Sequence, residues 1–125
     1  MILLTKEEII RIHQTLIDRT GGVSGLRDEG LLESSVYSTE GSFEGHELYP
    51  SVKEKAARLC FSLICNPAFF DGNKRLGILA MLLSLRLYSV PLQYSQTDLI
   101  RLGLGVAKGE TSCEEILSWI GKHSR

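Results

Sequence analysis

The feature that most constrains the fold of this chain is a run of twelve residues, Leu76 to Leu87, in which Arg86 is the only charged side chain. The run is too short to cross a bilayer, so it predicts a helix at the centre of a folded protein. The flanking segments have helical periodicity, and few alternate with the period of two that strands show. We therefore predict an all-α fold, a compact bundle of about six helices around this central helix.

Helix starts are marked by residues that cap free backbone N–H groups. We expect a first helix from a Thr5 cap to about Arg19, ended by Gly21-Gly22, and a short helix capped by Asp28 that includes Val36. The remaining helices are expected at about 51–65, 72–89, 96–107 and 112–121. Residues 38–50 are predicted to form a long loop, and loops of this length often carry function. Only Pro91–Tyr94 is a candidate for a short extended segment.

Length and charge limit the classes of function. A chain of 125 residues is expected to form a single domain, 1–125. The net charge of −1 gives no indication of binding to nucleic acid or to an anionic membrane. No secretory signal is visible. The three cysteines are an odd number without a CxxC pair, so Cys60 and Cys65 are predicted to be small buried hydrophobes in a reducing, cytoplasmic protein.

The apolar run is directly preceded by a polar segment of five residues, Asp71 to Arg75. The segment combines a carboxylate, a glycine, an amide and two cations. Free N–H groups at a helix start, together with the helix dipole, favour a bound anion. Gly72 would let a phosphate approach the backbone, and Asn73, Lys74 and Arg75 would supply donors and positive charge. Asp71 is an oxygen ligand suited to Mg²⁺. The segment therefore predicts a phosphate site with a metal ion beside it.

A simpler interpretation of the same segment stays open. Asp-Gly-Asn is a common turn, and Lys74 and Arg75 could form a solvated first turn of the helix. Two cations at a helix N-terminus oppose the dipole, however, and a bound anion would remove that conflict.

The segment resembles the Fic-domain motif in the form used by death-on-curing (Doc) toxins, His-Pro-Phe-x-Asp-Gly/Ala-Asn-Lys-Arg. Phe69 and the residues from Asp71 to Arg75 match it. Further stretches that resemble the family are Leu4–Glu8, Ile12-His13, Gly21-Gly22, Gly25–Ser34, Glu47–Pro50 and Val106–Gly109. The resemblance implies a small all-α bundle with the motif at the start of the central helix.

By this resemblance, Asp71 would bind Mg²⁺, and Gly72, Asn73, Lys74 and Arg75 would hold the phosphates of ATP. Most Fic proteins transfer AMP to a hydroxyl of a target protein. Doc-type members carry a lysine after the asparagine, as Lys74 does here, and phosphorylate a threonine of a bacterial translation elongation factor. Such toxins are usually neutralised by a small antitoxin protein whose helical tail covers the active-site groove.

The chain departs from the motif where the family has its general base. The family's histidine falls at Pro67 and its proline at Ala68. Proline has no titratable group, and loss of a positioned base typically costs about 10²- to 10⁴-fold in rate. His46, in the expected long loop, is a weak candidate for a replacement base, with Glu44 and Glu47 as weaker ones. His13 is expected to have a structural role beside the core.

Three hypotheses follow. The chain could be an active Doc-like transferase, either a protein Ser/Thr phosphotransferase or a nucleotidyltransferase. It could instead be a catalytically impaired module that binds nucleotide or antitoxin, or a structural relic without ligand.

Overall fold

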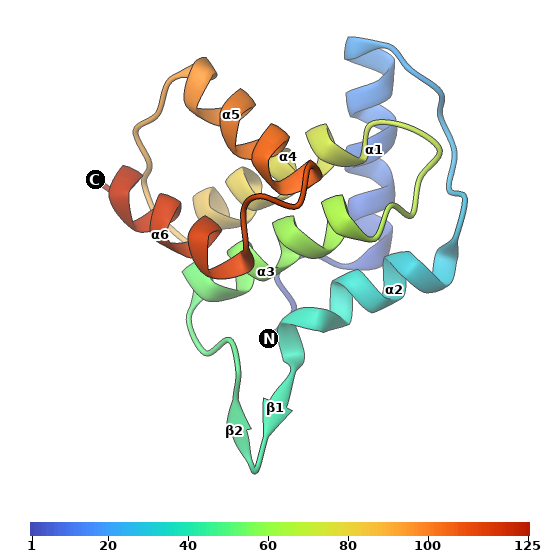
Figure 1. Cartoon of the computed structure of the whole chain (residues 1–125). Helices are drawn as coiled ribbons and strands as arrows, with labels where there is room; N and C mark the ends of the chain where they lie inside the picture. The colour runs from blue at the N-terminus through green and yellow to red at the C-terminus, as the bar shows by residue number, and fades with distance from the viewer.

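The computed structural model describes all residues, 1–125, and its architecture is almost entirely helical. The six helices are α1 (Lys6–Thr20), α2 (Glu29–Tyr37), α3 (Val52–Cys65), α4 (Asn73–Leu87), α5 (Gln96–Ala107) and α6 (Cys113–His123) (Figure 1). The predicted all-α fold is confirmed, and the predicted helix ranges agree with the structure to within about two residues, the usual uncertainty of helix ends.

Side-chain caps open five of the six helices. Thr5, Ser95 and Ser112 each form a capping box, and Asp28 and Ser51 each accept a bond from a first-turn backbone N–H. Such caps satisfy N–H groups that have no partner within the helix. Helix α4 is the exception, because its cap residue is Gly72, in a left-handed conformation with φ of 75° and no side chain to cap with.

Helices α3 and α4 form the centre of the bundle. The two buried clusters of the core both draw on α3 and α4, one against α5 and α6 and the other against α1 and α2. The two central helices pack closely at Gly77, where an added Cβ atom would lie only 2.5 Å from Cγ1 of Ile64. A larger residue at this position would force the helices apart.

The prediction that the other helices surround α4 needs a correction on one of its faces. Leu76, Ala80, Met81 and Leu85 are buried, but Leu79, Leu82 and Leu83 are only half-buried and Leu87 is 65% exposed. One face of α4 therefore borders a groove. Cys65 is also exposed, contrary to expectation, whereas Cys60 is buried, and burial raises the pKa of the Cys60 thiol. No helix is long and apolar enough to span a bilayer.

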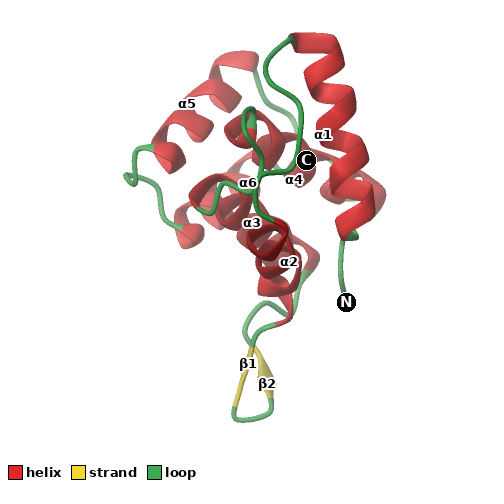
Figure 2. Ribbon diagram, turned by 90° about the vertical axis from the view of Figure 1, so that its right-hand side faces the viewer, coloured by secondary structure: helices red, strands yellow, loops and turns green.

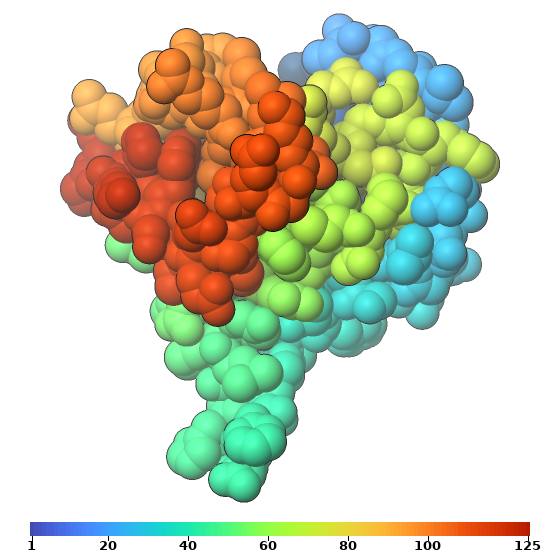
Figure 3. Space-filling view, in the orientation of Figure 1, coloured from blue at the N-terminus to red at the C-terminus, as the bar shows by residue number.

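The segment predicted as a long loop contains ordered structure. After a 3-10 turn at Ser38–Glu40, strands β1 (Ser42–Phe43) and β2 (His46–Glu47) form an antiparallel hairpin. Its two turn residues, Glu44 and Gly45, both have positive φ, which matches the twist of the strands. The hairpin projects from the body of the protein (Figures 1 and 2), and the space-filling view shows it as a narrow extension (Figure 3).

A buried lysine on α3 anchors this hairpin. The Nζ atom of Lys55 donates to the carbonyl oxygen of Thr39 at 2.9 Å and lies 3.7 Å from Glu40 and 3.8 Å from Glu47. The expected extended segment Pro91–Tyr94 is represented by an isolated bridge between Leu92 and Ser124.

Candidate phosphate-binding site

The loop from Asn66 to Gly72 is held by backbone bonds to a segment that precedes α2. The N–H groups of Arg27 and Asp28 both donate to the carbonyl oxygen of Ala68, at 2.8 and 2.9 Å. The N–H of Phe70 donates to the carbonyl of Gly25 at 3.2 Å. The loop, yellow-green in Figure 3, lies at the surface beside the blue end of α1.

The side chain of Asn73 closes this loop onto the start of α4. Its Nδ2 donates to the carbonyl oxygen of Phe69 at 3.0 Å, and its Oδ1 accepts the N–H of Phe69 at 3.1 Å. Oδ1 and one of the two Nδ2 hydrogens are therefore engaged with the backbone, and the second Nδ2 hydrogen remains able to donate to a ligand.

The carboxylate of Asp71 is positioned by two backbone donors. Oδ2 accepts the N–H of Val23 at 3.0 Å, and Oδ1 accepts the N–H of Gly72 at 2.8 Å. These bonds, that from Val23 above all, hold the pKa of Asp71 below its ordinary value, so the group is ionised at neutral pH. The side chain remains 45% exposed, and each oxygen keeps a lone pair. This carboxylate fits the oxygen ligand that Mg²⁺ requires.

Gly22 allows α1 to end against this carboxylate. An added Cβ atom would lie 2.6 Å from Oδ2 of Asp71, and the φ of +120° already disfavours other residues. Gly21-Gly22 ends α1 as predicted. The N–H of Val23, the next residue, orients the Asp71 carboxylate. This contact could not be predicted from the sequence, because Val23 and Asp71 are 48 positions apart.

The first turn of α4 presents three backbone N–H groups without an acceptor. They belong to Asn73, Lys74 and Arg75, whereas the N–H of Leu76 already donates to the carbonyl of Gly72. The N–H of Gly72, just before the helix, already donates to Oδ1 of Asp71. Three aligned donors at the positive end of a helix dipole are able to bind an anion.

The two cations of the motif have different roles. Arg75 reaches to the end of α1, where Nη1 donates to Oγ1 of Thr20 and to the carbonyl oxygen of Gly21. Lys74 is exposed and forms no ion pair or hydrogen bond, and its aliphatic stem lies against Gly103 of α5. Lys74 is thus the cation that is free to meet a ligand, while Arg75 ties α4 to α1.

No histidine occupies the position of a general base. His13 is 1% exposed, and its Nε2 lies 2.7 Å from the carbonyl oxygen of Asp71, so the expected structural role is confirmed. His46 lies on the exposed hairpin, which joins the opposite end of α3 from the motif loop, and the 14 residues of α3 span about 21 Å (Figure 1). The structure does not bring His46, Glu44 or Glu47 to the site, and Pro67 is contacted by Arg27, whose Nη2 donates to its carbonyl oxygen.

An apolar groove begins beside the two cations. This cavity of about 560 Å³ lies between α1, α4 and α5. Among its lining residues are Lys74, Arg75, Leu79 and Leu82 of α4, together with Leu16 of α1 and Ile100 of α5. A partner segment in this groove would border the phosphate site directly.

Comparisons with known proteins agree with this geometry. The Fic/DOC family model matches residues 3–85. The chain is 28% identical to the Protein kinase doc of Escherichia phage P1 over 113 residues, which cover 90% of this chain and 88% of that protein. It is 44% identical to Toxin Doc of Mycolicibacterium smegmatis (strain ATCC 700084 / mc(2)155) over 55 residues, which are 44% of this chain and 42% of the toxin. The match to that toxin therefore spans less than half of either protein. With the motif at the start of α4 in an all-α bundle and the family model matching residues 3–85, the chain belongs to the Fic/Doc family.

Proposed function

We propose that this protein binds the phosphates of Mg-ATP at the start of α4 and acts as the toxin-type partner of a toxin–antitoxin pair. The observation that carries the proposal is the set of three unpaired N–H groups, on Asn73, Lys74 and Arg75, next to the ionised Asp71. The free ammonium group of Lys74 adds the positive charge that a polyphosphate requires.

Asp71 would hold the magnesium ion, which neutralises phosphate charge when bound. The bonds from Val23 and Gly72 keep the carboxylate ionised and oriented without occupying all of its lone pairs. Arg75 contributes indirectly, because its bonds to Thr20 and Gly21 fix the first turn of α4 relative to α1.

Transfer of the γ-phosphoryl group would form a bond between phosphorus and a target hydroxyl oxygen, break the bond to the β,γ-bridging oxygen, and release ADP. A threonine of a translation elongation factor is the proposed target, by analogy with Doc-type proteins. The hydroxyl proton must leave, and because the side chain at position 67 cannot accept it, the proton would pass to solvent water or to an oxygen of the transferred phosphoryl group. We therefore propose that ATP binding is retained, while transfer is slower by about 10²- to 10⁴-fold than in a variant that has the base.

The alternative is a binding module that retains ATP or the antitoxin without transfer. The observation in its favour is that no candidate base is available at the site: His13 is bonded and buried, and His46 lies on the distant hairpin. Nucleotidyl transfer, with attack of the target hydroxyl at the α-phosphorus and release of pyrophosphate, would use the same phosphate-binding site at the start of α4.

The decisive experiment compares the wild-type protein with a double variant, Pro67→His with Ala68→Pro. The N–H of Ala68 makes no hydrogen bond, so a proline there removes none. Both proteins are incubated with Mg²⁺, bacterial lysate and ATP labelled at the α or γ position. Labelling of a target from γ-labelled ATP, and stronger labelling by the double variant, would support phosphoryl transfer; α-label in the target would indicate nucleotidyl transfer.

ATP binding is measured separately by calorimetry, with Lys74→Ala as the site variant and the exposed Lys108→Ala as its control. If the wild-type protein bound ATP with micromolar affinity, and neither it nor the double variant labelled a target, the alternative of a binding module without transfer would be supported. No binding of ATP by the wild-type protein, or equal binding by Lys74→Ala, would refute the proposed site.

We further propose that a small antitoxin covers the groove between α1, α4 and α5, where it would block access to Lys74. A cytoplasmic location follows from the proposed target.

A further inference from the structure

The hydroxyl group of Thr20 lies beside the phosphate site and is bonded to one of its cations. Thr20 is the last residue of α1, it is exposed, and it lines the groove of about 560 Å³ together with Lys74 and Arg75. Its Oγ1 donates to the carbonyl oxygen of Leu16 at 2.7 Å and accepts from Nη1 of Arg75 at 2.5 Å. A hydroxyl oxygen has two lone pairs, so one of them remains free.

The contact with Arg75 suits a hydroxyl that attacks phosphorus. A guanidinium group bonded to the oxygen stabilises the negative charge that develops there as the hydroxyl proton leaves. Lys74, which lines the same groove, supplies a second positive charge for the phosphates. Thr20 therefore has, within hydrogen-bond distance, a group that eases loss of its proton although no general base is present.

Thr20 also has an advantage over any separate target, because it belongs to the same chain as the phosphate site. Effective molarities of well-oriented intramolecular reactions reach about 10⁵ M or more. The absence of a positioned base costs about 10²- to 10⁴-fold in rate. The gain from tethering is large enough to offset this loss, so the proline at position 67 hinders transfer to Thr20 less than transfer to a diffusing protein.

We propose that Thr20 is a self-phosphorylation site, and that the phosphate on Thr20 closes the ATP site. The inference rests on the proposed function, because it requires ATP at the start of α4. Oγ1 of Thr20 would form the new bond to the γ-phosphorus, the bond from that phosphorus to the β,γ-bridging oxygen would break, and ADP would leave. The hydroxyl proton would pass to an oxygen of the transferred phosphoryl group or to water.

The phosphate would remain in the groove after the transfer. It carries a charge of about −2 at neutral pH and three acceptor oxygens, which would pair with Arg75 and Lys74. The helix dipole disfavours an anion at the C-terminal end of α1, and the two cations offset this effect. Because the modified side chain would use the positive charge that ATP requires, the phosphorylated protein would bind ATP more weakly.

A second exposed hydroxyl lies near the site, on Ser24. It follows Val23, whose N–H donates to Asp71, but the hydroxyl of Ser24 makes no hydrogen bond to a cation. The structure therefore favours Thr20 over Ser24 as the acceptor.

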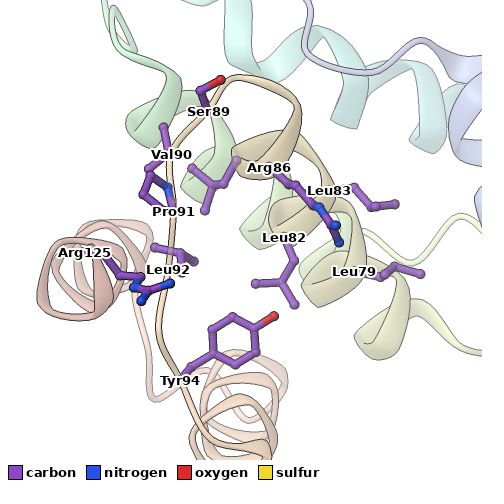
Figure 4. A pocket seen from close by; sticks show the side chains of 11 residues that line it. Leu79, Leu82, Leu83, Arg86, Ser89, Val90, Pro91, Leu92, Tyr94 and Arg125 are labelled. Carbon is purple, nitrogen blue, oxygen red and sulfur yellow. The ribbon is translucent and has the colours of Figure 1, made fainter.

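A matched control comes from the other end of α4. The exposed Ser89 lines a cavity of about 700 Å³ to which Arg86 and Arg125 also contribute (Figure 4). This cavity thus has a hydroxyl and two cations, but no carboxylate lines it, and it lies at the C-terminal end of the helix, where no free N–H groups are available. Ser89 is therefore not expected to accept a phosphoryl group.

The first test uses the purified full-length protein with Mg²⁺ and γ-labelled ATP, without lysate. We expect one added phosphoryl group, located on Thr20 by tandem mass spectrometry. The labelled fraction at a given time should not depend on protein concentration, because the reaction occurs within one chain. Thr20→Val, which nearly keeps the shape of the side chain, should abolish the label, and Ser89→Ala should retain it. Label on Ser24 instead, or a fraction that rises with protein concentration, would overturn the proposal.

The second test measures ATP affinity by calorimetry and does not depend on transfer. Thr20→Asp and Ser89→Asp each place a carboxylate in an arginine-lined cavity. We expect Thr20→Asp to bind ATP about tenfold or more weakly than wild type, and Ser89→Asp to differ from wild type by less than about twofold. Equal affinities of the two variants would overturn the closure of the site. A wild-type protein that does not bind ATP would refute the proposed function, whereas ATP binding without label on Thr20 would refute this inference alone.

Discussion

The ring of His13 supports the backbone of Asp71 from inside the protein. Its Nε2 lies 2.7 Å from the carbonyl oxygen of Asp71, and because a carbonyl only accepts, Nε2 carries the hydrogen. The same ring stacks on Phe69 with 3.9 Å between ring centroids. One buried side chain on α1 thus holds the loop at two residues that lie on either side of Phe70.

Replacement of His13 by alanine should destabilise the protein by about 2–4 kcal/mol, because it leaves a cavity and an unpaired carbonyl. His46→Ala, on the exposed hairpin, should change the free energy of unfolding by less than about 0.5 kcal/mol. Urea denaturation of both variants at neutral pH measures the difference. A His13 variant as stable as the His46 variant would contradict the supporting role.

Asp71→Asn should lower stability at neutral pH, and the deficit should disappear in acid. The folded-state pKa of Asp71 lies below its ordinary value, so its contribution is complete above the unfolded-state pKa of about 3.9 and is lost as pH falls through the folded-state pKa. Urea unfolding of both proteins from about pH 7 to pH 2.5 gives the comparison. If the difference in the free energy of unfolding between the two proteins stayed constant across this range, the backbone bonds to Asp71 would not depend on its charge.

Gly22→Ala should be more damaging than Gly21→Ala. Both glycines have positive φ, but only at Gly22 would the new methyl group meet Oδ2 of Asp71, at 2.6 Å. We expect a loss of about 1–3 kcal/mol beyond that of the Gly21 variant, together with weaker ATP binding. Thermal unfolding and calorimetry of the pair test this, and equal effects would mean that the α1 end can move away from Asp71.

Lys55→Met should loosen the β-hairpin. It removes the donor to the buried carbonyl of Thr39 and the positive charge near Glu40 and Glu47, which costs about 1–3 kcal/mol. Hydrogen exchange at the Leu48 amide, which donates to Gly41, should become faster. Lys53→Met is the control, since Lys53 makes no ion pair. Unchanged exchange in Lys55→Met would show that the hairpin is held by its own strand pairing.

Most of the helical fold is predictable, because its signals are local. Ser51, Ser95 and Ser112 cap their own first turns, and apolar periodicity marks the stripes that reach the core. The hairpin is not predictable in this way, because its strands have only two residues each and no alternating pattern. An apolar helix with an open face, such as α4, has the same composition as a fully covered one.

The candidate site is predictable in its residues but not in their contacts. Asp71 and the start of α4 lie where the motif places them. The bonds of Asp71 to Val23, of Arg75 to Thr20 and of Arg27 to Pro67 join residues 40 to 55 positions apart, so they depend on how the helices assemble. For the same reason, the remoteness of His46 becomes apparent only in three dimensions.

The motif loop owes its path to main-chain bonds, from Arg27 and Asp28 to Ala68 and from Phe70 to Gly25, and none of these uses the side chains at positions 67 and 68. The path of the loop therefore does not depend on whether a general base is present. The motif differs from the family's at Pro67 and Ala68, and substitution of both side chains would keep every one of these main-chain bonds. Substitution at positions 67 and 68 could therefore supply the base without a change in the path of the loop.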